Sequence, residues 1–106
     1  MDIATEFLEW WRNPRERRSF RAKFREPIRY SCGPHGLLDE DALERKERAL
    51  APEDVRLESS SPTDTGFRLV VLFRDPVTML RHRATITARL ESEQLAHVDE
   101  YVEIVQ

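Results

Sequence analysis

The last part of the chain alternates between polar and apolar side chains over two long runs, and this alternation limits the fold more than any other feature. In the first run, from Thr78 to Leu90, the even-numbered positions are mostly apolar and the odd-numbered positions are mostly polar. In the second run, from Ala96 to Ile104, the even-numbered positions are again apolar, with one exception. A period of two residues is typical of a strand with one buried face, so both runs predict β-strands.

The two predicted strands should pair antiparallel around the polar residues 91–94. Matching their apolar faces sets the register, because a shift of one residue would turn every side chain to the opposite face. The cross-strand pairs expected in this register are Leu90 with Ala96, Ala88 with Val98, Ile86 with Glu100, Ala84 with Val102 and His82 with Ile104.

Two polar side chains, His82 and Glu100, interrupt these apolar faces. In the expected register they are four rows apart, which is roughly 13 Å at about 3.3 Å per residue. An imidazole or a carboxylate on a core face is costly unless it is paired, neutral or hydrated. Each residue therefore predicts either a structural partner or a water-filled pocket, and the sequence leaves both possibilities open.

A helix is the alternative interpretation of residues 95–105. Leu95, Val98, Val102 and Val105 fall at helical spacing. On that interpretation Glu100 would simply be solvated.

Length and composition are those of one soluble globular domain, which we expect to span residues 1–106. No apolar run approaches the roughly 18 residues of a membrane span, and the first residues do not resemble a signal segment, so a cytoplasmic location is expected. Cys32 is the only cysteine, which excludes an intrachain disulfide.

The charge is distributed unevenly. Between Arg12 and Arg29 eight basic and two acidic residues give a net charge of +6, although the whole chain carries −3. Such a segment can neutralise phosphates, but a charge run is more often a solvated face. No aromatic stacking pattern, zinc ligand set or recognition helix accompanies it, so nucleic-acid binding is not expected. Acidic residues elsewhere in the chain, or in a second subunit, could cover it.

Helical patterns precede the strands. Asp2 is a plausible N-cap for a first helix with a broad apolar face, and Pro14 and Pro27 bound a second, basic helix. A short strand at residues 28–32, a turn at 33–36 and a helix that begins at residue 39 or 40 and ends before Pro52 follow. Strands at residues 55–60 and 67–74, joined by a turn at 61–66, lead into the long hairpin. This order indicates an α+β fold with N-terminal helices packed on a curved antiparallel sheet.

Few other residues suggest chemistry. Cys32 and His35 are close enough to suggest an activated thiol, but a small buried hydrophobic Cys32 is the expected state. The scattered histidines and the single cysteine make no metal-ligand set, and Gly33 and Gly36 lack the lysine of a phosphate-binding loop, so no metal or cofactor is expected. Aromatic residues at helical spacing are more often core than a ligand site. Those of the first two helices are Trp10, Trp11, Phe20 and Phe24.

Four local sequences resemble the nuclear transport factor 2-like (NTF2-like) superfamily, in particular small bacterial relatives of SnoaL-type polyketide cyclases and of ketosteroid isomerase. They are the first helix with its aromatic face, residues 27–31 (Pro-Ile-Arg-Tyr-Ser), the glycine turn that leads into residues 37–43, and the hairpin that ends at residues 98–102. The resemblance covers nearly the whole chain. It implies a cone-shaped, cystatin-like fold in which a bent sheet wraps around helices and encloses a pocket for a small apolar molecule, commonly in a homodimer formed through the outer sheet face.

The resemblance also implies a candidate catalytic group. Enzymes of this superfamily often use an acidic residue on a cavity-facing strand as a general base, and a buried carboxylate with a raised pKa is a good proton acceptor. Glu100 would be that base, with Tyr30 or His82 as the hydrogen-bond donor. The enzyme would be an isomerase, cyclase or hydrolase that needs no cofactor. Asp99, which matches an acidic position of several relatives, falls on the outward parity here.

A domain without catalytic activity is the alternative function. It would bind a partner or carry a ligand as a homodimer. The outward-facing residues of the two long strands would suit a self-complementary sheet interface; they are Arg81, Arg83, Thr85, Thr87, Arg89, Asp99, Tyr101 and Glu103.

Overall fold

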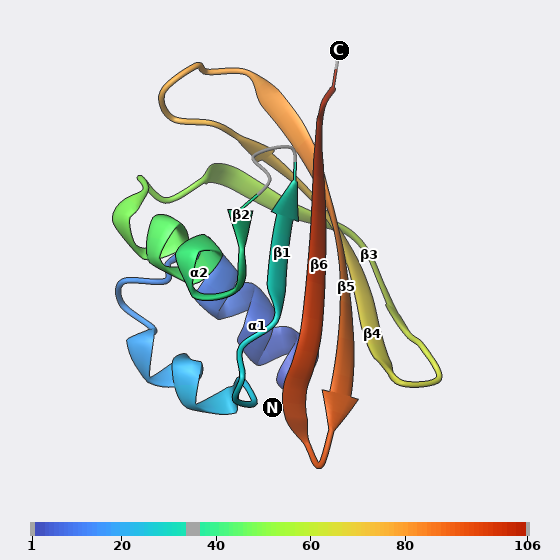
Figure 1. Ribbon diagram of the computed structural model, residues 1–106. Helices are drawn as coiled ribbons and strands as arrows, with labels where there is room; N and C mark the ends of the chain where they lie inside the picture. The colour runs from blue at the N-terminus through green and yellow to red at the C-terminus, as the bar shows by residue number, and fades with distance from the viewer. Residues whose placement is uncertain (1, 34–36, 106) are drawn as a thin grey trace.

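The computed structural model describes residues 2–33 and 37–105 and has an α+β fold, as the sequence predicts (Figure 1). Helices α1 and α2 lie on the same side of a twisted sheet (Figure 1). The elements in chain order are α1 (Ile3–Arg12), the 3-10 helix η1 (Arg18–Lys23), β1 (Tyr30–Gly33), β2 (Leu37–Leu38), α2 (Asp39–Arg48), β3 (Glu53–Pro62), β4 (Gly66–Arg74), β5 (Arg81–Glu91) and β6 (Gln94–Ile104).

The sheet has six strands in the order β2-β1-β6-β5-β4-β3 and is mixed, not purely antiparallel as expected. Strands β3 to β6 form antiparallel neighbours, whereas β1 runs parallel to β6, with Tyr30 opposite Val98 and Cys32 opposite Glu100. Tight turns force the antiparallel pairings. Strands β1 and β6 are joined by most of the chain instead, so no turn dictates their direction.

The register of the β5–β6 hairpin is confirmed over most of its length. His82 lies opposite Ile104, and Ile86 lies opposite Glu100. The prediction is wrong at one end, where Leu90 pairs with Leu95 because a register shift follows Arg89. Strand β5 also begins at Arg81, since residues 75–80 form a turn in which the Asp75 amide donates to the Leu80 carbonyl and the Met79 amide donates to the Asp75 carbonyl. The helical alternative for residues 95–105 is wrong.

The first helix begins as expected, because the Asp2 carboxylate accepts a hydrogen bond of 2.8 Å from the Thr5 amide. The second helix is shorter than expected and is a 3-10 helix. Arg17, Arg21 and Arg25 would stack at intervals of four residues in an α-helix, and like charges at this spacing destabilise it. Phe20 and Phe24 nevertheless reach the core.

An aromatic cluster fills the space between the helices and the sheet. The Trp10 ring stacks on Phe20 with centroids 5.7 Å apart and meets Phe24 at 5.5 Å, and Phe7 and Tyr30 surround them. All five side chains are buried. The prediction that Trp10, Trp11, Phe20 and Phe24 belong to the core is confirmed, since Trp11 is buried as well.

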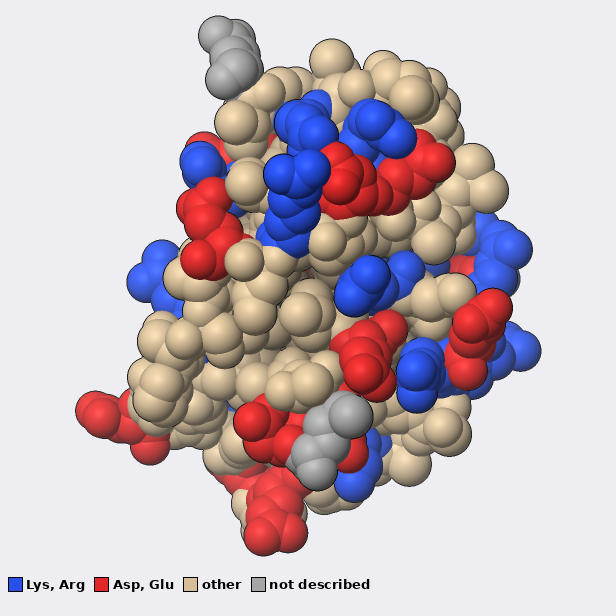
Figure 2. Space-filling view, turned by 180° about the vertical axis from the view of Figure 1, so that it is seen from behind, with Lys and Arg blue, Asp and Glu red and all other residues tan. Residues whose placement is uncertain are grey.

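Backbone carbonyl groups and an acidic side chain of α2 pair with part of the basic segment. The Arg15 guanidinium donates hydrogen bonds of 2.9 Å to the carbonyl oxygens of Glu47 and Arg48, at the C-terminal end of α2. Arg18 and Arg21 both approach the buried Glu47 carboxylate at 3.5 Å. On the face that Figure 2 shows, blue and red side chains lie side by side, and the basic residues do not form one continuous patch. These contacts hold the segment around η1 against α2.

Within the part of the chain that the structure describes, no helix is both long and apolar enough to cross a membrane.

Candidate functional site

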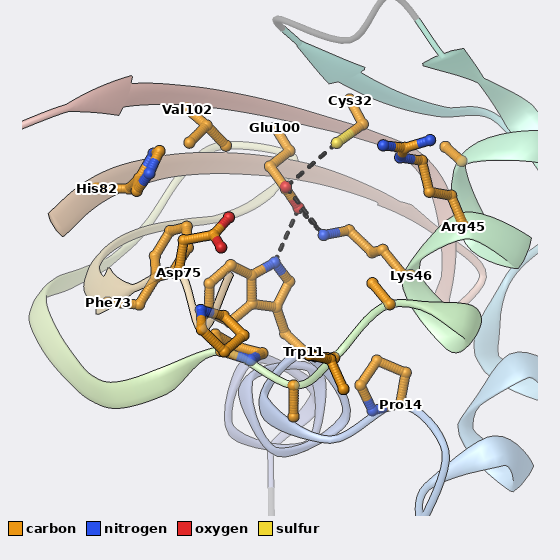
Figure 3. Close-up of a pocket in the computed structure, with 16 residues that line it drawn as sticks. Trp11, Pro14, Cys32, Arg45, Lys46, Phe73, Asp75, His82, Glu100 and Val102 are labelled. Atoms are coloured by element: carbon orange, nitrogen blue, oxygen red, sulfur yellow. Dashed lines mark hydrogen bonds and ion pairs between the residues drawn. The ribbon is translucent and has the colours of Figure 1, made fainter. Parts of the chain in front are cut away.

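The carboxylate of Glu100 is the most densely bonded polar group of the structure's interior. Glu100 is 3% exposed, and its Oε1 accepts hydrogen bonds from Trp11 Nε1 at 2.8 Å and from the Tyr30 hydroxyl at 2.7 Å. The Cys32 thiol donates to Oε2 at 3.3 Å, and the Lys46 ammonium lies 2.9 Å from both oxygens. Figure 3 shows the contacts from Trp11, Cys32 and Lys46 converging on the carboxylate. Its acceptor positions are therefore occupied.

Four different elements bring these groups together. Tyr30 and Cys32 are two residues apart on β1, so they point to the same side of the sheet, and the parallel register sets Cys32 beside Glu100 of β6. Trp11 comes from the last turn of α1, and Lys46 comes from α2. The even-numbered residues of β6 face the helices, so the Glu100 side chain points toward α1 and α2.

Lys46 compensates the buried charge. Its side chain is 16% exposed, and its Nζ lies 5.2 Å from the centroid of the Trp11 ring and 5.8 Å from that of Tyr30. Ring faces attract a cation at such distances. The ammonium is therefore stabilised by one carboxylate and two aromatic rings.

The direction of each pKa shift follows from this environment. Burial alone would raise the pKa of Glu100, but the Lys46 ammonium and the hydrogen bonds from Tyr30, Lys46 and Trp11 outweigh it and hold the pKa below its ordinary value of 4.5. This is the opposite of the raised pKa that accompanies a general base. Burial, and then the Glu100 charge, raise the pKa of Tyr30 well above 10.0 and that of the Cys32 thiol to about 12.

A pocket of about 170 Å³, partly open to solvent, lies directly above this network. Most of its lining is apolar, with a polar base at Glu100 (Figure 3). The lining residues are Trp11, Pro14, Cys32, Ala42, Arg45, Lys46, Ala49, Leu50, Ala51, Pro52, Phe73, Asp75, Pro76, His82, Glu100 and Val102.

The structure brings two of the three candidate catalytic residues to this pocket. Glu100 forms its base, and His82 of β5 lines its far end, stacked on Phe73 with centroids 5.3 Å apart. His82 Nε2 is buried and has no hydrogen-bond partner among the described residues. Tyr30 is 1% exposed and does not line the pocket, so it contacts Glu100 from behind. A ligand in the pocket would meet Glu100 and His82 but not the Tyr30 hydroxyl.

Sequence reasoning missed Lys46, Arg45, Trp11 and Asp75 as pocket residues. A signal was present in α2, where Ala42, Arg45, Lys46 and Ala49 have the spacing of one helix face. The charged residues of this helix obscured the signal, because charged side chains are mostly exposed in proteins. Both tryptophans belong to the core cluster, and nothing in the sequence shows that Trp11 also lines the pocket whereas Trp10 does not.

His35 lies outside the described residues, as does Gly36, so the interpretations of Cys32 with His35 and of the glycine pair have no structural counterpart here. Cys32 itself is buried and keeps its proton at neutral pH, since its pKa is raised to about 12. Among the described residues, no group of three His, Cys, Asp or Glu side chains could hold a metal ion.

Comparisons of the chain with protein-family models, with curated proteins and with solved structures gave no match. The pocket is therefore interpreted from its own residues.

Replacing Lys46 tests the energetic role of the ion pair. We expect Lys46→Met to lower the free energy of unfolding by about 3 kcal/mol, because it leaves the Glu100 charge buried without its counter-ion. The double variant Lys46→Met with Glu100→Gln should lose distinctly less than the sum of the two single variants. Urea unfolding at pH 7 measures all three.

Arg48→Met is the matched control, since Arg48 is on the same helix and is exposed, with only a surface contact to Glu44. It should change stability by less than about 0.5 kcal/mol. Additive effects of the Lys46 and Glu100 substitutions would contradict the coupling.

Proposed function

We propose that this protein binds a small molecule in the pocket above Glu100 and that its fold is of the NTF2-like type. The observation that carries the proposal is the half-open cavity of about 170 Å³, whose walls are apolar and whose base holds a compensated pair of charges. Small-molecule sites commonly combine apolar walls with a few fixed polar groups.

The arrangement of the elements supports the NTF2-like part of the proposal. Helices come first, a sheet encloses their apolar faces, and the pocket opens between α2 and the strands that carry Phe73 and His82. Helices on one side of a twisted sheet and a pocket beside them support this part of the proposal.

Binding is favoured over catalysis by the state of Glu100. A general base needs a free lone pair and a pKa near the working pH. Here Trp11, Tyr30, Cys32 and Lys46 all donate to the carboxylate, and its pKa is lowered. A cofactor-independent isomerase, cyclase or hydrolase that used Glu100, His82 and Tyr30 would first have to displace these donors.

Screening single-ring fragments by NMR tests the binding proposal. We expect fragments to bind with dissociation constants of about 1 mM or below, which corresponds to about −4 kcal/mol, and to shift the indole signal of Trp11. Ala49→Phe should abolish binding, because Ala49 lines the pocket and the added ring would fill its mouth.

Ala22→Phe is the matched control, because Ala22 is an exposed residue of η1 that does not line the pocket. It should leave fragment binding unchanged. A library without any fragment that distinguishes wild type from Ala49→Phe would contradict the proposal.

We propose as a second function a homodimer through the outer sheet face, which is favoured by a row of side chains that contains the exposed Tyr101 and the half-buried Thr85 and Val70. Tyr101 is 58% exposed, and it lies opposite Thr85 of β5, which in turn lies opposite Val70 of β4. The neighbouring Arg83 is already paired with Glu58 and Glu103 within the chain. The row therefore offers an aromatic and an apolar contact surface bordered by compensated charges.

Sedimentation equilibrium over a range of concentrations tests the homodimer. We expect Tyr101→Glu to shift the protein to a monomer, since it sets a charge at the centre of a self-complementary contact. Thr65→Glu, in the exposed turn between β3 and β4, is the control and should leave the association unchanged. A wild-type protein that stays monomeric at all concentrations would refute this proposal.

A further inference from the structure

We propose that the ligand of this pocket is a small carboxylate with a flat apolar body, of the size of benzoate, and that Arg45 and Lys46 bind its carboxylate. This inference rests on the proposed binding function and names its ligand class. It follows from the charges, the free hydrogen-bond donors and the dimensions of the pocket.

Two cationic groups lie on one side of the pocket. Ala42, Arg45, Lys46 and Ala49 share the face of α2 that lines it, and the alanines between the long side chains leave room above Glu100. Figure 3 shows Arg45 and Lys46 on this side, with Asp75 and His82 on the opposite side. The two sides of the pocket therefore differ in charge, with the basic side chains on one side and the Asp75 carboxylate on the other.

Lys46 has a donor to spare. An ammonium carries three N–H groups, and the two oxygens of Glu100 lie at 2.9 Å from Nζ and can take two of them. The third N–H is left for a group in the cavity. Because the Glu100 charge cancels that of Lys46, the net charge of this side comes from Arg45.

Arg45 has no acidic partner among the described side chains. Arg48 on the same helix, by contrast, pairs with Glu44 at 3.6 Å. A guanidinium matches a carboxylate in shape and can bind both of its oxygens. Arg45 together with the third N–H of Lys46 thus forms a site for an anionic group, and a carboxylate fits both sets of donors.

The remaining space suits one flat ring. A dry cavity of roughly 150 Å³ accommodates benzene in an engineered protein, so about 170 Å³ leaves room for a ring and a small substituent. The rings of Trp11 and Phe73 meet edge to face, with centroids 5.2 Å apart, and both line the pocket. An aromatic or other flat apolar body could pack against them.

Asp75 sets the orientation of the ligand. Its Oδ1 accepts hydrogen bonds from the amides of Val77 and Thr78 at 2.7 and 3.1 Å, which leaves only Oδ2 for the pocket. The Asp75 charge repels an anion at this end, so the carboxylate of the ligand would point to α2. A cationic ligand would find the Asp75 carboxylate, with one oxygen already occupied, at this end and the net positive charge of Arg45 at the other.

Measuring the affinities of benzoate, benzamide and benzylamine by NMR titration at pH 7 tests the inference. These probes share one ring and differ in charge. We expect benzoate to bind at least about tenfold more tightly than benzamide, a difference of about 1.4 kcal/mol, and benzylamine to bind most weakly. Arg45→Gln should remove the preference for benzoate.

Arg48→Gln removes the same charge from the same helix without touching the pocket, and it should keep the preference. Asp75→Asn can retain the two amide contacts through its own Oδ1 and should tighten the binding of benzoate but not that of benzamide. These two variants separate a pocket effect from the overall charge of the protein.

Benzamide or benzylamine binding as tightly as benzoate would overturn the ligand class and leave the binding function standing. Benzoate binding that persists in Ala49→Phe would also overturn it, since the anion would then occupy a surface site. Failure of all three probes, and of other single-ring fragments, would overturn the inference together with the proposed function.

Discussion

The ion pair between Glu100 and Lys46 is the interaction on which the rest of the site depends. A lone carboxylate at this depth would be strongly disfavoured, and the ammonium, the hydroxyl of Tyr30, the indole of Trp11 and the thiol of Cys32 together compensate it. Because the folded-state pKa of Glu100 lies below 4.5, the stabilisation is present above that pH and is lost as the pH falls through the folded value. One charge thereby connects α1, β1, α2 and β6.

The pocket is a consequence of this arrangement. Lys46 must reach the sheet to meet Glu100, so the face of α2 that carries Lys46 points toward β6. Ala42 and Ala49 lie on the same face, and their small side chains leave a space. The contacts of Arg15 with the end of α2 hold the helix in this position. A compensated polar base beneath apolar walls suits recognition of a ligand better than proton transfer, because the carboxylate has no free acceptor and little tendency to take up a proton.

Period-two alternation predicted the β5–β6 register around Ile86 and Glu100 and the position of His82 near one end of the same face. The order of helical and strand patterns predicted the α+β class. The partners of Glu100 could not be predicted, since Lys46 is fifty-four residues away and belongs to a helix rich in charged residues, which are mostly exposed in proteins. The parallel pairing of β1 with β6 was equally hidden, because it is a long-range contact without a turn to indicate it. Local patterns specify strands and faces, whereas the site arises from contacts between distant elements.

The ionisation state of Glu100 tests this account most directly. Its side-chain carboxyl can be followed by carbon-detected NMR while the pH is lowered from 7 to the limit of the folded state. The account predicts that Glu100 stays ionised through pH 4.5 and takes up a proton only below it, and that Lys46→Met moves this transition to higher pH. A transition near pH 6 in the wild-type protein, typical of a carboxyl group tuned for acid–base catalysis, would contradict it.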